Sequence, residues 1–83
     1  MKKADRDRIA EYSLSPIIEL SGNTYCTIEG IKRISEFTNE KIKIDIGKLS
    51  VSLTGDGLSI RDFSPQGAEI EGTIIALEFE SNG

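Results

Sequence analysis

The residue types that most often perform chemistry in proteins are almost absent from this sequence. Its 83 residues include no His and a single Cys, Cys26. Without His the chain lacks the commonest general base and the commonest zinc ligand. One Cys forms neither an internal disulfide nor a cysteine-based metal site, and we interpret Cys26 as a half-buried strand residue. The sequence therefore predicts a non-enzymatic protein without catalytic residues, cofactor or metal.

Carboxylates are the one abundant reactive type, with fourteen Asp or Glu against ten Lys or Arg. Paired acids can serve a hydrolase, but four near the C-terminal end alternate with apolar residues, which places them on solvated strand faces: Glu69, Glu71, Glu78 and Glu80. The net charge of −4 argues against non-specific nucleic-acid binding. No uncharged stretch is long enough to insert into a membrane as a helix.

The apolar residues indicate a β protein. Ile occurs thirteen times, and Leu and Val together occur seven times; β-branched side chains pack well on a pleated sheet. Apolar and polar residues alternate through 41–46 and 48–54, and no window between Pro16 and Glu80 shows a helical period. With Gly, Asn and Pro as turn residues, the expected strands are 17–20, 24–29, 31–36, 41–46, 48–54, 57–62, 68–71 and 73–80.

These runs predict an all-β fold, a small antiparallel meander or rolled sheet of about seven to eight short strands. A weak internal repeat has an apolar residue, any residue and then Gly. This repeat leaves a short β-solenoid open as the alternative fold. Residues 16–83 are expected to form a single β domain, and residues 1–15 are expected to be a charged N-terminal tail or a short helix. The alternation slips between Ile74 and Ile75, which predicts a bulge or bend near Gly72.

The alternating runs also predict the core. Their apolar members are expected to be the most buried side chains: Ile28, Ile42, Ile44, Ile46, Leu49, Val51, Leu53, Leu58, Ile60, Ile70, Leu77 and Phe79.

Charge is distributed unevenly along the chain, and this suggests an interaction surface. Residues 62–83 contain five acids and no base, whereas 31–48 contain five bases and three acids. One interpretation is ordinary decoration of a solvated surface; the other is a head-to-tail contact in which an acidic edge strand meets a basic strand of a second copy. The acidic side would present Ile74 or Ile75 with Glu78 and Glu80 as a charged rim, and the basic side would present Lys41, Lys43 and Lys48.

Ordered segments over most of the chain resemble the YabP/YqfC family of sporulation proteins. The first half contributes Pro16-Ile17-Ile18-Glu19-Leu20-Ser21-Gly22-Asn23, Ile28-Glu29-Gly30-Ile31 and Glu36-Phe37-Thr38-Asn39-Glu40-Lys41-Ile42. The second half contributes Gly47-Lys48-Leu49-Ser50-Val51, the run from Leu53 to Ile60, and Ile70-Glu71-Gly72-Thr73-Ile74. The opening segment is more similar to the YqfC-like branch.

The resemblance implies a non-enzymatic protein made in the mother cell of an endospore-forming bacterium, with a structural or interaction role in spore envelope formation. It implies a cytoplasmic location in the mother cell, which includes the forespore surface, and a membrane protein of sporulation as partner. Self-association through strand edges is the second expected mode of binding. The alternative is a small ligand-binding or regulatory β module unrelated to sporulation, with a concave pocket between its sheet faces.

Overall fold

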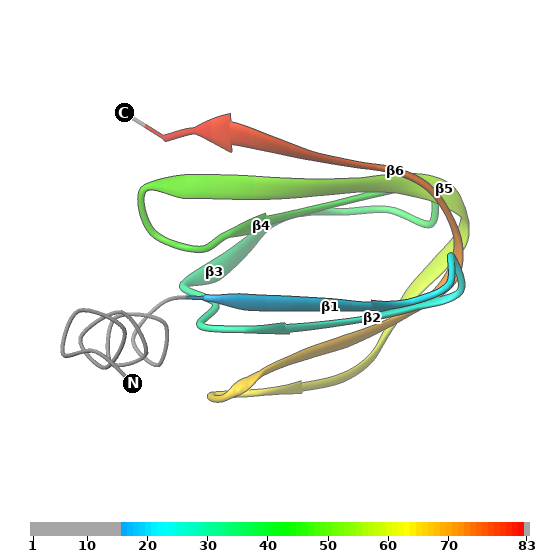
Figure 1. The fold of residues 1–83 in the computed structure, drawn as a ribbon, viewed down its shortest axis with the longest axis horizontal. Coiled ribbons are helices and arrows are strands. Elements are labelled where there is room, and N and C mark those ends of the chain that lie inside the picture. The colour runs from blue at the N-terminus through cyan, green and yellow to red at the C-terminus, as the bar shows by residue number, and fades with distance from the viewer. Residues whose placement is uncertain (1–15, 83) are drawn as a thin grey trace, which may run out of the picture.

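The computed structural model describes residues 16–82, which build one folded antiparallel sheet (Figure 1). Its strands lie in the order β1-β2-β6-β5-β4-β3, each antiparallel to its neighbours. Their bounds are β1 Ile17–Ser21, β2 Tyr25–Glu29, β3 Arg33–Phe37, β4 Lys41–Asp45, β5 Leu49–Ser64 and β6 Gly67–Ser81. The prediction of an antiparallel all-β fold is confirmed. The expectation for residues 1–15 lies outside the described residues.

The described residues form six strands, fewer than expected, because two expected turns are bends inside longer strands. Gly55-Asp56-Gly57 was expected to separate two strands, but β5 continues through it. β6 likewise continues through Gly72, whose φ is 133° and which lies where the β5–β6 register shifts, between the pairs Ser59–Glu71 and Asp56–Thr73. The bend expected near Gly72 is therefore confirmed, and the turn expected at 55–57 is corrected to a bend.

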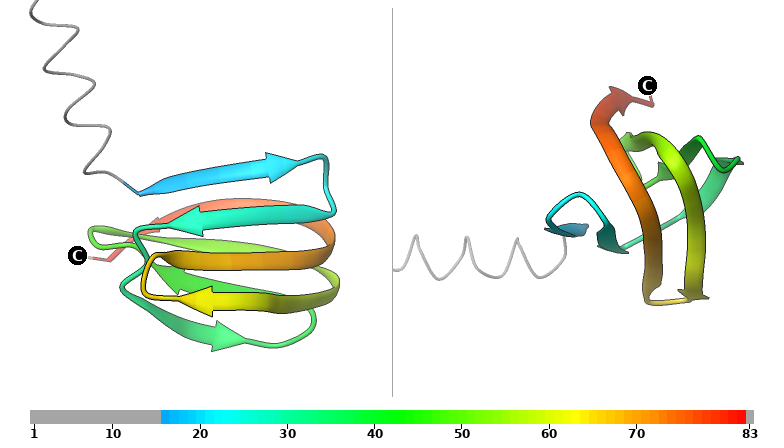
Figure 2. Two further views of the ribbon diagram at one scale, coloured as in Figure 1. Left: turned by 90° about the horizontal axis from the view of Figure 1, so that it is seen from below. Right: turned by 90° about the vertical axis from the view of Figure 1, so that its right-hand side faces the viewer.

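The shared bend folds the sheet into two layers (Figures 1 and 2). We call the first layer β1, β2, residues 67–71 of β6 and residues 59–64 of β5. The second layer consists of β3, β4, residues 49–56 of β5 and residues 73–81 of β6. Because β5 and β6 run through both layers, the layers form one continuous sheet and the chain is not a solenoid of stacked rungs.

The backbones approach closely at the bend. A methyl group added at Gly55 would lie 1.8 Å from the carbonyl oxygen of Thr73. Two hairpin turns flank the bend, and their carbonyl oxygens accept hydrogen bonds from its backbone N–H groups. Ile74 N donates to Asn23 O at 2.7 Å, and Leu58 N donates to Asn39 O at 2.8 Å. The bend therefore keeps these donors paired although neither turn is part of a ladder.

Aliphatic side chains from both layers fill the space between them. Eight of the twelve expected core residues are buried: Ile28, Ile42, Ile44, Ile46, Val51, Leu53, Leu58 and Ile70. Ile60 and Leu77 are half-buried. The expectation was wrong for two: Leu49 is 41% exposed because it begins its strand, and Phe79 is 56% exposed because it lies on a strand with a neighbour on one side. Cys26, Ala68 and Ile74 belong to the core instead.

Truncation of Ile44 should test which face of β4 is the core. Ile44 is fully buried on a strand that is flanked by β3 and β5, so Ile44→Ala should lower the free energy of unfolding by about 2–4 kcal/mol through lost transfer energy and a cavity. For a domain of this size that is a large share of the total stability, so the milder Ile44→Val, with a cost of about 1 kcal/mol, provides a folded comparison.

Urea unfolding followed by circular dichroism measures both variants. Ile75→Ala is the matched control, because Ile75 is exposed and its truncation should cost about 0.5 kcal/mol or less. An urea midpoint for both Ile44 variants equal to that of the wild type would show that the assigned core face is wrong.

Candidate interaction surface

The folded sheet leaves four strand edges without a strand beside them in residues 16–82. β1 and β3 are the ends of the strand order. Of β6, only residues 67–71 pair with β2, and of β5, only residues 50–54 pair with β4. The far sides of β6 and β5 are therefore open over part of their length. We call residues 75–80 the β6 edge and residues 59–64 the β5 edge.

The two isoleucines at the start of the β6 edge have opposite environments. Ile74 pairs with Gly55 and is 7% exposed, while Ala76 pairs with Thr54. The register therefore leaves Ile75 as the extra residue of a bulge, and its side chain is 70% exposed. Of the two residues proposed from sequence, only Ile75 lies on the surface.

The acidic and basic residues of the expected surface lie on one face of the second layer. Glu78 and Glu80 pair with Ser52 and Ser50 of β5, and these serines pair in turn with Lys43 and Asp45 of β4. Residues opposite one another in a sheet share a face. The structure thus brings the acids and Lys43 together within one chain, where the Lys43 ammonium and a Glu80 carboxylate oxygen are 3.3 Å apart.

The remaining lysines are further from the β6 edge. Lys41 forms an ion pair with Glu36 at 3.9 Å. Lys48 lies in the turn before β5, where its carbonyl accepts a hydrogen bond from Asn82 N at 2.9 Å. The Asn82 side chain also donates to Asp45 Oδ1 at 2.9 Å, which ties the C-terminal end to this turn. Glu78 has neither an ion pair nor a side-chain hydrogen bond in the part of the chain that the structure describes.

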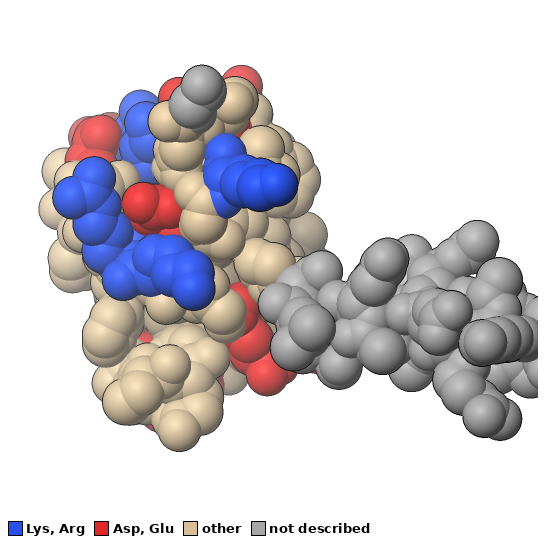
Figure 3. Space-filling model, turned by 90° about the vertical axis from the view of Figure 1, so that its left-hand side faces the viewer, with Lys and Arg blue, Asp and Glu red and all other residues tan. Residues whose placement is uncertain are grey.

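Basic side chains gather at the end of the molecule opposite the bend (Figure 3). β4 is flanked by β3 and β5, so its backbone is not available for edge pairing. The strand of the second layer with an open edge and a basic residue at its start is β3, which begins with Arg33. Arg33 lies 3.6 Å from Asp45, and its side chain is 74% exposed. Sequence reasoning missed Arg33 as an edge residue because the lysine alternation of β4 is the stronger basic pattern.

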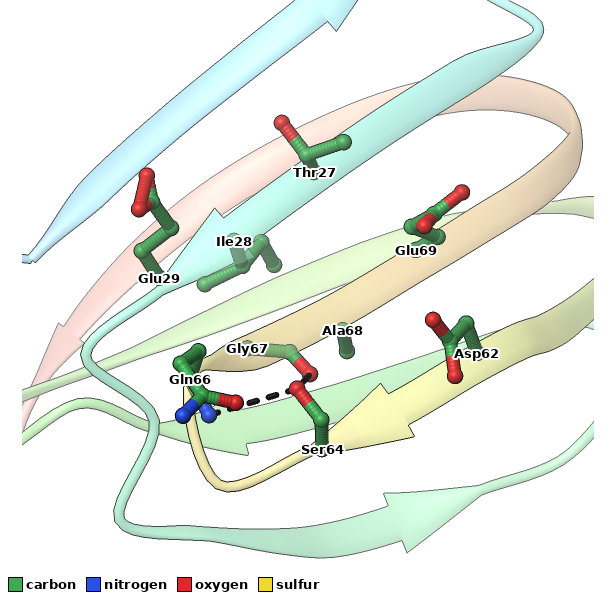
Figure 4. A pocket seen from close by; sticks show the side chains of 9 residues that line it. All are labelled: Thr27, Ile28, Glu29, Asp62, Ser64, Gln66, Gly67, Ala68 and Glu69. Atoms are coloured by element: carbon green, nitrogen blue, oxygen red, sulfur yellow. Dashed lines mark hydrogen bonds between the residues drawn. The ribbon is translucent and has the colours of Figure 1, made fainter.

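The outer face of the first layer is acidic and carries a shallow depression of about 300 Å³ (Figure 4). Glu29, Asp62 and Glu69 surround it, and Gly67 opposite Glu29 leaves its floor without a side chain. The Tyr25 hydroxyl donates to Glu69, and this hydrogen bond raises the pKa of Tyr25 because the carboxylate acceptor favours the neutral phenol. The depression lies outside the two layers, whereas the alternative of a ligand-binding module expected a pocket between them.

Cys26 is fully buried, and burial raises the pKa of its thiol to about 11. At neutral pH it is therefore protonated, and protonated buried thiols are poor nucleophiles. Within residues 16–82 no three side chains of Asp, Glu or Cys converge in a geometry that could hold a metal ion.

The fold and this surface define a small antiparallel β domain with open strand edges. The sequence profile of the YabP family matches residues 14–83, and the chain belongs to this family. The resemblance predicted from sequence is thereby confirmed, and membership indicates a sporulation-related protein; the assignment to the YqfC-like branch stays a prediction. No curated protein and no solved structure matches the chain significantly. None of the described residues lies in a helix long and apolar enough to cross a membrane.

Lysine substitutions at the two adjacent isoleucines should separate fold from surface. Ile74→Lys places a charge in the core and should abolish cooperative thermal unfolding. Ile75→Lys leaves the new ammonium in solvent and should move the midpoint of the circular-dichroism melt by a few degrees at most, since it changes stability by about 0.5 kcal/mol or less. Equal losses for the two variants would contradict the bulge.

Proposed function

We propose that this protein is a non-enzymatic component of spore envelope formation that acts by docking through its strand edges. Its place of action is the mother-cell cytoplasm, including the forespore surface, and its partners are a second copy, a membrane protein of sporulation, or both. Family membership supports the sporulation role. The structural observation that supports docking is the β6 edge, where a strand that is paired on one side only exposes Ile75 and Phe79.

The β6 edge has the properties of a strand-addition site. An unpaired strand offers a row of N–H and C=O groups to an incoming strand, and exposed apolar side chains on the same strand supply the burial that makes pairing specific. Soluble proteins usually protect such an edge with Lys, Pro or a covering element. The β6 edge contains no Lys and no Pro, and its cation neighbour Lys43 comes from β4.

An Ile75→Lys allele in sporulating cells tests this proposal. The variant should fold, yet a lysine on the open strand should prevent pairing, so a fluorescent fusion should lose its position at the forespore surface and heat-resistant spores should become fewer. Phe63→Lys is the matched control, because Phe63 is a similarly exposed apolar residue on the β5 edge of the other layer. Wild-type localisation and spore yield in the Ile75→Lys strain would contradict docking through the β6 edge.

A further inference from the structure

The two edges of the second layer are arranged so that copies of the chain can join head to tail. In this layer the strand order is β6-β5-β4-β3 and every neighbour is antiparallel. Four alternating strands give the layer two edges that run in opposite directions. A second copy placed beside the first by simple translation would therefore set its β3 antiparallel to β6, and each added copy would present the same open edge again.

We propose that the β6 edge pairs with the β3 edge of a second copy, which extends the second layer from chain to chain. This inference rests on the proposed function, because it names the partner and the strand that the β6 edge recognises. It assigns the basic side of the contact to Arg33 of β3, in place of the lysines of the interior strand β4.

One register matches both faces of the two edges. With Glu78 opposite Arg33 of the neighbour, Leu77 comes opposite Ile34. β3 has an extra residue between Ile34 and Glu36, where its own pairing with β4 shifts. If this extra residue, Ser35, is left without a partner in the new contact as well, Ala76 comes opposite Glu36 and Ile75 comes opposite Phe37. Ile34 and Phe37 pair with core residues of β4, so they lie on the inner face, as Leu77 does through its pairing with Leu53.

This register covers apolar surface that each chain leaves open. Ile75 and Phe37 are both more than half exposed, and Leu77 and Ile34 are half-buried. Aromatic and branched side chains directly opposite one another stabilise a strand pair. The contact thus places one row of side chains, continuous with the core, across the junction between copies.

Charge favours β3 over a second β6 as the partner. Glu78 has no partner of opposite charge within residues 16–82, and Arg33 has only an exposed pair with Asp45. In the proposed register these two charges are opposite each other on the outer face. Pairing of β6 with β6 would instead bring two acidic strands together, since residues 73–81 contain Glu78 and Glu80 and no base, and like charges across a strand pair are unfavourable.

The edges of the first layer are less suited to pairing. β1 follows directly after Pro16. The β5 edge ends directly before Pro65. Proline lacks a backbone N–H and is one of the features that protect open edges from association.

Charge exchange between Arg33 and Glu78 tests the contact with the full-length chain. In sedimentation velocity at low salt, the wild type should increase in mass with concentration beyond a dimer. Arg33→Glu alone and Glu78→Arg alone should each weaken association by about tenfold or more, because attraction becomes repulsion. A 1:1 mixture of the two variants, and the double variant, should both regain it. Arg61→Glu, an exposed charge on the first layer, is the control and should associate like the wild type.

Thermal melts establish that each variant is folded, and Arg33→Gln with Glu78→Gln provide a neutral pair in case a reversed charge disturbs the fold. A contact of β6 with β6 would make Glu78→Arg associate at least as well as the wild type and leave Arg33→Glu unaffected, which would overturn the proposal. A wild type that remains monomeric at all concentrations, or a mixture that regains nothing, would also overturn it. If Ile75→Lys still disrupts localisation in cells, the docking function stands and only the identity of its partner is wrong.

Discussion

The fold depends on the close contact of two backbones where the β5–β6 hairpin bends. Gly55 faces the Thr73 carbonyl at a distance that leaves no room for a side chain, and Gly72 adopts a positive φ at the same level. The turn at 22–24 and the residues around Asn39 accept hydrogen bonds from the bent strands. Because one hairpin supplies strands to both layers, this bend fixes how the layers face each other and where the core lies between them (Figure 2).

The open edges are a consequence of the same bend. The outer partners of the hairpin, β2 and β4, are each five residues long and cover only part of the strand beside them. β2 pairs with β6 in the first layer, and β4 pairs with β5 in the second layer. Each long strand therefore has neighbours on both sides in one layer and on one side in the other. The β6 edge is therefore exposed by the construction of the fold. Its bulge leaves Ile75 exposed to solvent while Ile74 fills the core.

Local patterns in the sequence predict the strands and their faces, but not which strands meet. The alternation through 41–46 and 48–54 correctly assigns Ile42, Ile44 and Val51 to the core, and the slip at Ile74–Ile75 correctly indicates a bend. Gly55-Asp56-Gly57 was misinterpreted because glycine pairs are typical of hairpin turns. Here Gly55 allows close packing of two strands, and Gly57 adopts a positive φ of 60° within the bend. The pairing of Tyr25 with Glu71 spans most of the chain, and no local signal in the sequence encodes it. Phe79 alternates like a core residue and is exposed only because its strand is an edge.

The most direct test of this account is the stability of Gly55→Ala in urea. In a strand without steric conflict, Gly→Ala stabilises by about 0.4–1 kcal/mol through the unfolded chain. At this position the added methyl group would force β5 away from Thr73, so the account predicts a loss of about 3 kcal/mol or more in the free energy of unfolding. Gly22→Asn is the control, because nothing lies near a side chain there and Asn tolerates its φ of 55°. If Gly55→Ala is as stable as the wild type or more stable, the close packing of the bend is not what holds the two layers together.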